Sequence, residues 1–350
     1  MVDPLAPFNA LAVLVNQTQD LASKDDKLPP GRSEQLVALA HRIGKIRDLE
    51  NGSAKKRVGV FGAPNRGKST LLNTLLGGDV LPMAQVPLST TTIEIEQDSS
   101  VEQWRLVINH ASGRIESRDC ESTQEVAELL ERFGSRRGGA EPAERLRLKG
   151  AFPNCRILGM GGVLMDTPGA EVAFGSDERL EAEARRAVEA LGNTHVVLFC
   201  IRADQIGSRS DNDLYEKHIR ILSPVHVVTM KDKWPDDPGY LVDEVFKQYG
   251  LTQANPILFS AVEARSSETR ATSGIDELEG MIERELEKLS SEAGLIPCLR
   301  DYELAIEDYP RLRPHRIHFL NLYHAVENQP DGSGDLVLAR MNAAPEFWKT

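Results

Sequence analysis

The chain has 350 residues, 41% of them hydrophobic and 27% charged, which fits one large domain with additions or two domains. Its net charge of −12 opposes broad nucleic-acid binding, because that binding needs a positive surface. The four cysteines lie far apart with no C-x-x-C pair, so we expect reduced thiols in a cytoplasmic protein and neither a metal cage nor a disulfide framework. Residues 1–4 lack the basic stretch of a secretory signal, and no apolar run approaches the roughly 20 residues that a membrane span needs.

Two amphipathic helices are predicted at the start of the chain. Apolar residues recur at helical spacing over residues 5–22 and again over residues 33–50, where Ser33 is a candidate N-cap. A Pro/Gly-rich linker, residues 23–32, separates them. The helices either add packing to the domain that follows or form a small helical bundle beside it.

Residues 62–70 match the phosphate-binding pattern G-x-x-x-x-G-K-[ST]. The apolar run 56–62 predicts a strand before the loop, and the spacing over 70–76 predicts a helix after it. In that geometry, successive backbone N–H groups point at one anion, Lys68 reaches the β- and γ-phosphates, and the Ser69 hydroxyl ligates Mg²⁺. The candidate phosphate-binding residues are Gly62, Asn65, Arg66, Gly67, Lys68, Ser69 and Thr70.

Strands and helices then alternate, which predicts an α/β fold with a parallel sheet covered on both faces. Apolar strands are expected over residues 162–166, 194–201, 225–229 and 256–260. Helices are expected over residues 177–191, 211–222, 243–249 and 273–289. Residues 91–96 and 104–109 predict half-exposed strands, and residues 111–150 form a charged, partly helical insertion. Ligands of such sheets bind at the carboxyl ends of the strands.

A magnesium site is predicted where the strand ending at Asp166 continues as Thr-Pro-Gly. The carboxylate can hold Mg²⁺ through a water, and Gly169 can offer its N–H to a γ-phosphate. A hydroxyl from the 88–92 loop would supply a second oxygen; spacing favours Thr90, with Ser89 and Thr91 as alternatives. The candidate metal ligands are Ser69, Thr90 and Asp166.

A base-recognition site is predicted after the next-to-last strand, at Thr229-Met-Lys-Asp232. The Asp232 carboxylate can accept both the N1–H and the 2-amino N–H of guanine, which adenine does not offer. The pair Ser260-Ala261 after the last strand would add a main-chain N–H. The candidate residues here are Thr229, Lys231, Asp232, Ser260 and Ala261.

These motifs occur in the order of the five G-motifs, and over residues 54–292 the chain resembles the translation-factor-related GTPases. Pro64-Asn65 and the Leu-Leu-Asn of residues 71–73 resemble the Era-like group. Residues 77–95 resemble bacterial dynamin-like proteins, as do the helices before the P-loop and the wide gap between Thr92 and Asp166. We favour the dynamin-like group.

The resemblance implies a P-loop GTPase three-layer sandwich with a mostly parallel sheet and flanking helices that form a small bundle. It divides the chain into N-terminal helices (1–53), a G domain (54–292) and a partly helical tail (293–350). It also implies binding of GTP and GDP with Mg²⁺, hydrolysis of GTP, and activation through a nucleotide-dependent homodimer.

Two positions depart from the family pattern. Met230 stands where the guanine motif has Lys, and it can copy the apolar stem but not the charge, so guanine preference is expected in a weakened form. Ala170 follows Gly169 where other GTPases have a water-orienting Gln. Catalysis is therefore assigned to Asn65, Lys68 and Thr90, with Asn65 implied to hold K⁺ beside the phosphates. Arg66 is the alternative charge donor, although we favour a solvent-facing loop residue.

The partner predictions follow from the same features. Self-association is expected first, and nucleic acid is not expected as a partner. Residues 309–323, rich in aromatic and basic residues, either contact acidic lipids or a protein partner, as in a protein peripheral to a membrane, or pack with their charges solvated. The alternative functions are an Era-like GTPase bound to ribosomal or transfer RNA and a slow GTP-bound switch that acts through a partner protein.

Overall fold

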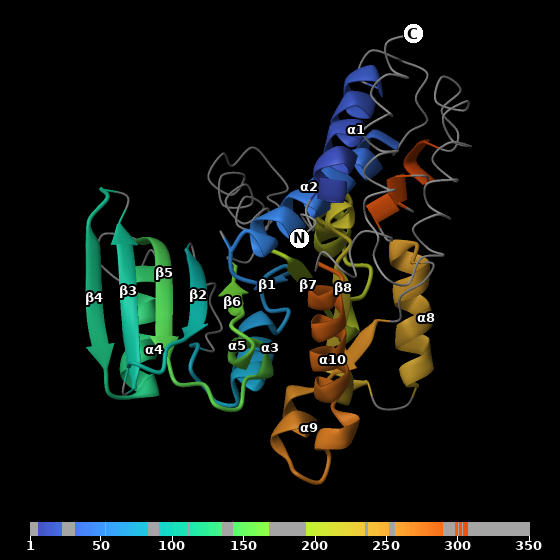
Figure 1. The fold of residues 1–350 in the computed structure, drawn as a ribbon. Helices are drawn as coiled ribbons and strands as arrows, with labels where there is room; N and C mark the ends of the chain where they lie inside the picture. Colours follow the sequence, from blue (N-terminus) through green and yellow to red (C-terminus); the bar gives the residue numbers. More distant parts are fainter. Residues whose placement is uncertain are drawn as a thin grey trace. The chain divides into compact units, whose positions relative to one another are not determined.

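The computed structural model divides into two compact units, residues 1–54 with 284–350 and residues 55–283 (Figure 1). The residues that the structure describes are 6–22, 32–52, 54–82, 91–101, 103–110, 112–134, 143–167, 194–234, 237–251, 256–289, 298–299, 301–302 and 304–306. The predicted helix over 177–191 and the segment 309–323 lie outside them.

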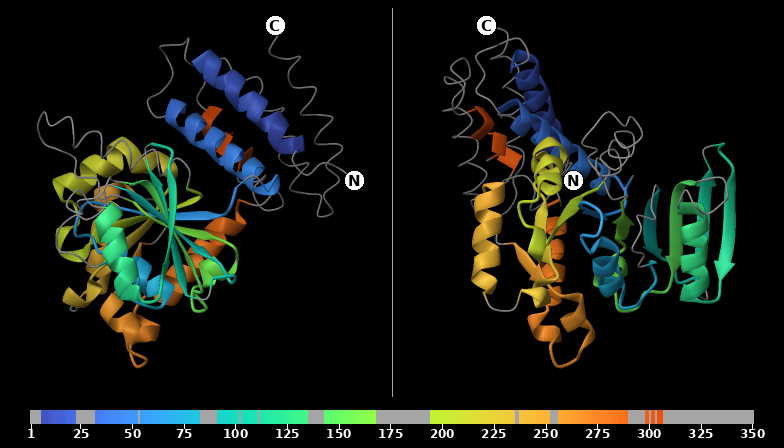
Figure 2. Two further views of the ribbon diagram at one scale, coloured as in Figure 1. Left: turned by 90° about the vertical axis from the view of Figure 1, so that its left-hand side faces the viewer. Right: turned by 180° about the vertical axis from the view of Figure 1, so that it is seen from behind.

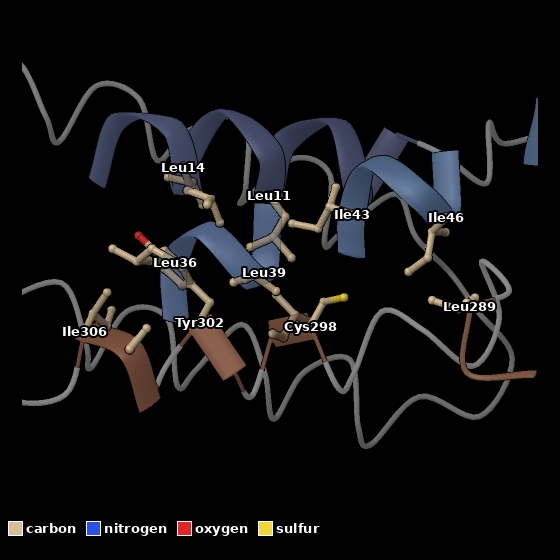
Figure 3. Close-up of a cluster of buried hydrophobic side chains, with 13 residues drawn as sticks. Leu11, Leu14, Leu36, Leu39, Ile43, Ile46, Leu289, Cys298, Tyr302 and Ile306 are labelled. Atoms are coloured by element: carbon tan, nitrogen blue, oxygen red, sulfur yellow. The ribbon is translucent and has the colours of Figure 1, made fainter. Parts of the chain in front are cut away.

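The first unit is helical. It contains α1 (Ala6–Ala22) and α2 (Arg32–Glu50), close to the predicted bounds, and residues 298–306 are helical where described. Apolar side chains from all three segments form one buried core (Figure 3). The segments are also joined by a hydrogen bond of 2.8 Å between the Thr18 and Tyr302 hydroxyls and an ion pair of 2.7 Å between Arg42 and Asp301. The N-terminal helices thus share a core with the C-terminal part of the chain, as in a small bundle.

The second unit is built on a nine-stranded sheet of order β4-β3-β5-β2-β6-β1-β7-β8-β9. Its strands are β1 (Arg57–Phe61), β2 (Thr92–Gln97), β3 (Trp104–His110), β4 (Ile115–Cys120), β5 (Ala143–Gly150), β6 (Val163–Asp166), β7 (Val196–Arg202), β8 (Val225–Thr229) and β9 (Ile257–Phe259). The five strands β6-β1-β7-β8-β9 are all parallel. The predicted α/β fold with a mostly parallel sheet is confirmed.

The remaining strands extend the sheet beyond β6. β2 is antiparallel to β6 and parallel to β5, whereas β3 is antiparallel to both β5 and β4. The segment 111–150, predicted as a charged and partly helical insertion, therefore contributes two strands of the same sheet as well as α4 (Thr123–Gly134). Leu146 and Leu148 of β5 are buried, whereas Arg147 between them and Lys149 after them are only partly buried, because successive side chains of a strand point to opposite faces.

Helices lie on both faces of the sheet (Figure 2). Their bounds are α3 (Lys68–Leu76), α5 (Arg156–Gly159), α7 (Arg209–Leu214), α8 (Pro238–Tyr249), α9 (Ala261–Arg265) and α10 (Ile275–Glu287). Helices α7 and α8 share a core with β1, β7 and β8, and a π-helical turn, Tyr215–Ile219, continues α7. None of the helices among the described residues is long and apolar enough to cross a membrane.

A buried histidine lies in the core under α7 and α8. His226 of β8 is 4% exposed, and its ring lies 5.4 Å from the Tyr215 ring and 5.8 Å from the Tyr249 ring. Its Nε2 has no hydrogen-bond partner within the described part of the chain. Burial lowers the pKa of His226 to about 4, because the charged ring would be desolvated there.

Because of this low pKa, we predict that the free energy of unfolding falls in acid. The fall should be smaller in the variant His226→Leu, which has no imidazole to protonate. The folded pKa lies below the ordinary value of 6.5, so the unfolded chain takes up the proton first. The contribution of His226 to the free energy of unfolding is complete above pH 6.5 and falls towards pH 4, by at most about 1.4 kcal/mol per pH unit. Denaturant unfolding at several pH values in this window should give a shallower pH dependence for His226→Leu than for the wild type. An exposed control, His41→Gln, should keep the wild-type slope; equal slopes for all three proteins contradict the prediction.

Candidate functional site

The predicted motifs gather at one edge of the sheet. β6, β1, β7, β8 and β9 are parallel neighbours, so the segments that follow their carboxyl ends leave the sheet on the same side. The loop after β1 is the phosphate-binding pattern, and Asp166 is the last residue of β6. Residues 230–232 follow β8, and residues 260–261 follow β9. The fold thus collects side chains that are far apart in the sequence.

The loop between β1 and α3 needs glycine at two positions. Gly62 has φ 152°, and a Cβ atom there would lie 2.6 Å from the backbone oxygen of Cys200. Gly67 has φ 78° and is the N-cap of α3. Asn65 has φ 59°, a left-handed conformation that Asn tolerates better than most residues, and its side chain is exposed.

Lys68 forms hydrogen bonds to the backbone of the loop that precedes it. Its ammonium group is buried and donates to the carbonyl oxygens of Gly62 and Ala63, each at 2.9 Å. Burial lowers the pKa of Lys68, and the charge of Asp166 opposes that change. The Lys68 ammonium thus lies at the N-terminus of α3, which itself carries partial positive charge. The two together would favour binding of an anion.

Ser69 and Asp166 form the candidate metal site. The Ser69 hydroxyl donates to Oδ2 of Asp166 at 3.0 Å, and Oδ1 of that buried carboxylate has no hydrogen-bond partner among the described residues. Burial raises the pKa of Asp166, while Lys68 and Ser69 oppose the rise. An unpaired carboxylate oxygen beside a hydroxyl fits a hard divalent cation that keeps most of its water ligands. The donor set therefore fits Mg²⁺.

The switch residues predicted around this site are only partly described. Thr90, Ser89, Gly169 and Ala170 lie outside the described residues. The hydroxyl of Thr91 is buried and donates to the carbonyl of Ala143 at 2.7 Å. That bond ties the residue before β2 to the first residue of β5, so the Thr91 hydroxyl is already used within the protein, and Thr90 stays the preferred candidate.

The predicted base-recognition residues lie together at the ends of β8 and β9. Ser260 donates its hydroxyl to Oδ1 of Asp232 at 2.7 Å and also accepts from the backbone N–H of Glu263 as the N-cap of α9. The ammonium of Lys231 pairs with Glu263 at 3.2 Å and bonds to the carbonyl of Thr272. Asp232 is thus oriented by Ser260, whereas the Lys231 ammonium connects the segment after β8 to α9 and to residue 272.

The favoured prediction that the Arg66 side chain faces solvent is wrong. Its side chain is buried, not solvent-facing, because the guanidinium pairs with the carboxylate of Asp211 at 2.9 Å. Burial raises the pKa of Asp211, and Arg66 opposes that rise. The carbonyl of Arg66 accepts a hydrogen bond of 2.8 Å from the hydroxyl of Thr229. The Arg66 side chain is therefore bound to the protein, and only its backbone remains a candidate phosphate ligand.

The residues that hold Arg66 were not predicted as part of the site. Gln205, Ser208, Ser210 and Asp211 all lie in the segment that follows β7. One signal was available: Ser208 and Asp211 stand three positions apart, the spacing of a capping box, and the Ser208 hydroxyl does accept from the backbone N–H of Asp211. That pattern predicts a helix start but not a partner in the phosphate loop.

Comparison with known proteins agrees with this geometry. The family model described as "Dynamin family" matches residues 58–231. Human Mitofusin-2 is 22% identical over 228 residues, which is 63% of this chain, and GTPase Der of Xanthomonas oryzae pv. oryzae (strain MAFF 311018) is 35% identical over 75 residues, 21% of this chain. The match spans only 28% of the length of Mitofusin-2 and 16% of that of Der.

A solved structure resembles nearly the whole chain. It belongs to an oligomerised bacterial dynamin pair, is 15% identical, and aligns with a TM-score of 0.51 over 98% of this chain and 52% of its own. A structure of Aquifex aeolicus Era bound to GDP and AlF₄⁻ is 22% identical and covers 65% of this chain, with a TM-score of 0.38. At these identities, the bacterial dynamin similarity concerns the fold.

The geometry of the phosphate loop predicts that Gly62→Ala destabilises the second unit by about 2 kcal/mol or more. The added Cβ meets a backbone oxygen that cannot rotate away, and φ 152° disfavours a side chain. Gly159→Ala is the matched control, since a Cβ there has nothing within 4 Å and φ is not left-handed. Denaturant unfolding compares the two variants with the wild type. Equal stability of the two variants would show that the loop is not packed as described.

Proposed function

Because residues 58–231 give this chain a dynamin-like GTPase domain, we propose that it binds GTP with Mg²⁺ and hydrolyses it to GDP and phosphate. The observation that carries the proposal is the group formed by Lys68, Ser69 and Asp166: a buried ammonium next to a hydroxyl–carboxylate pair, one of whose carboxylate oxygens accepts no hydrogen bond from the residues that the structure describes. This group lies at the N-terminus of α3, where phosphates bind favourably.

In the proposed reaction, the backbone N–H groups of residues 67–70 and the Lys68 ammonium bind the phosphates. Ser69 and Asp166, with Thr90 from the preceding loop, would hold Mg²⁺, which neutralises phosphate charge when it is bound. Gly169 would donate its N–H to the γ-phosphate. The protein's own contribution is a set of positive groups that are in place before the substrate arrives.

Guanine selection is assigned to Asp232. Its Oδ1 already accepts from Ser260 at 2.7 Å, so the carboxylate is held in one orientation towards a base. The N–H of Ala261 would add a donor, and Thr229 supports the phosphate loop through the Arg66 carbonyl. Met230, with φ 59°, would cover the base with an apolar side chain.

Hydrolysis is assigned to Asn65 and a bound K⁺, because Ala170 cannot orient water. Asn65 is exposed in the phosphate loop, so its amide oxygen would be the protein ligand for K⁺, and the bound ion would add positive charge near the phosphates. We assign activation to a homodimer formed across the nucleotide. The related bacterial dynamin pair is described as oligomerised, which supports self-association here.

A slow GTP-bound switch is the competing function, and Met230 with Ala170 favours it. It predicts tight binding of GTP and little hydrolysis even in a single turnover. The bacterial dynamin pair is described as a mechanism for the long-range sensing and tethering of membranes. We therefore propose that the protein is cytoplasmic and that its tail, residues 293–350, makes peripheral contact with a membrane.

The mechanism predicts that turnover per molecule rises with protein concentration and is higher in KCl than in NaCl. Asn65→Ala should abolish the difference between the two salts and keep the concentration dependence, because the variant loses the proposed cation ligand but not the dimer. Phosphate release measured over a concentration series in both salts checks this. Asn109→Ala, on β3, serves as the control. A wild-type rate that is flat in both variables contradicts the mechanism.

A further inference from the structure

One buried ion pair joins the phosphate loop to the segment after β7. Nε of Arg66 donates to both carboxylate oxygens of Asp211, at 3.0 and 2.9 Å. The side chains are 7% and 0% exposed. Ion pairs at the surface contribute little to protein stability. Charges buried this deeply destabilise the fold unless each one has an opposite charge and hydrogen-bond partners.

The remaining guanidinium nitrogens are also bonded. NH1 donates to the Gln205 side chain, and NH2 donates to the Ser208 hydroxyl at 3.1 Å. Ser208 in turn donates to Oδ2 of Asp211 at 2.8 Å. All of these partners belong to one segment, residues 205–211. This segment therefore forms a binding site for the guanidinium group of one arginine.

The backbone of Arg66 is fixed as well. Its carbonyl accepts from the Thr229 hydroxyl at 2.8 Å, so the side chain is bound to the segment after β7 and the main chain to the end of β8. The residues on either side have left-handed φ angles, 59° at Asn65 and 78° at Gly67. Residue 66 is therefore held at both its backbone and its side chain, between two residues of left-handed conformation.

We propose that Arg66 and Asp211 are positioning residues for hydrolysis, whose ion pair fixes residue 66 and thereby holds the exposed Asn65 side chain at the phosphates. This inference rests on the proposed GTPase function. Neither charge needs to touch the substrate. Replacing a buried ion pair by apolar residues of similar volume often costs no stability, so a purely structural role would be served equally well by such a pair.

The test compares four full-length proteins: wild type, Asp211→Asn, the double variant Arg66→Met/Asp211→Leu, and the control Asp204→Asn. Asp204 lies just before the segment 205–211 and forms a more exposed ion pair, with Arg202. For each protein, kcat and KM for GTP, the K⁺ concentration for half-maximal turnover, and the melting temperature are measured.

Asp211→Asn keeps the shape and removes the charge. We expect its kcat to fall between about 10- and 100-fold, as for a catalytic group displaced by about 1 Å. The half-maximal K⁺ concentration should rise, and KM should change less than about threefold, because the backbone N–H groups and Asp232 still bind GTP. The apolar double variant should regain melting temperature relative to Asp211→Asn without regaining turnover. Asp204→Asn should match the wild type.

Two results overturn the inference. In the first, the wild type hydrolyses GTP and the double variant, once folded, does so with the same kcat and the same half-maximal K⁺ concentration; the pair is then structural only. In the second, the wild type itself shows no turnover at any K⁺ concentration, and the proposed function fails together with the inference. Should Asp211→Asn not fold, the double variant decides the question.

Discussion

The candidate site depends on how the buried charges around one loop are held, by hydrogen bonds or by an ion pair. Lys68 and Asp166 lie on its inner side, and Arg66 and Asp211 lie where it meets the segment after β7. Isolated charges at these depths would cost several kcal/mol each, so every one of them constrains its neighbours. The carbonyl oxygens of Gly62 and Ala63 turn towards the Lys68 ammonium because that ammonium is buried. The loop conformation, including the glycines that it needs, follows from satisfying these groups.

The five parallel strands of the sheet bring these charged groups together. Because β6, β1, β7, β8 and β9 run in the same direction, four parts of the candidate site meet at one edge of the sheet. They are the candidate metal-binding carboxylate, the loop, the segment that binds the Arg66 side chain, and the candidate base-binding carboxylate. Two hydroxyls connect these parts: Thr229 bonds to the loop, and Ser260 bonds to Asp232. Preorganisation of this kind is the physical basis on which electrostatic catalysis of phosphoryl transfer rests.

The local part of this arrangement could be predicted from the sequence, and the long-range part could not. The phosphate loop and the carboxylate of Asp166 are recognisable because their chemistry lies in short runs that follow apolar strands. The partner of Arg66 stands 145 positions away, and nothing near Arg66 indicates a buried acid. The strand containing Leu146 and Leu148 has the alternation of a half-covered strand, but its many charges made the whole segment resemble an insertion. The roles of Thr91 and Lys231 depend on β5 and α9, which only the folded chain brings near.

We propose a preformed site that selects guanine through Asp232. Calorimetric titration of the wild type and Asp232→Asn with GDP and with XDP, in the presence of Mg²⁺, tests it most directly. Xanthine carries a carbonyl where guanine carries the 2-amino group, and an Asn amide can donate to that carbonyl. The wild type should bind GDP more tightly than XDP by about tenfold or more, and the variant should reverse the order. An unchanged preference in the variant, or no binding of GDP by the wild type, would contradict the account.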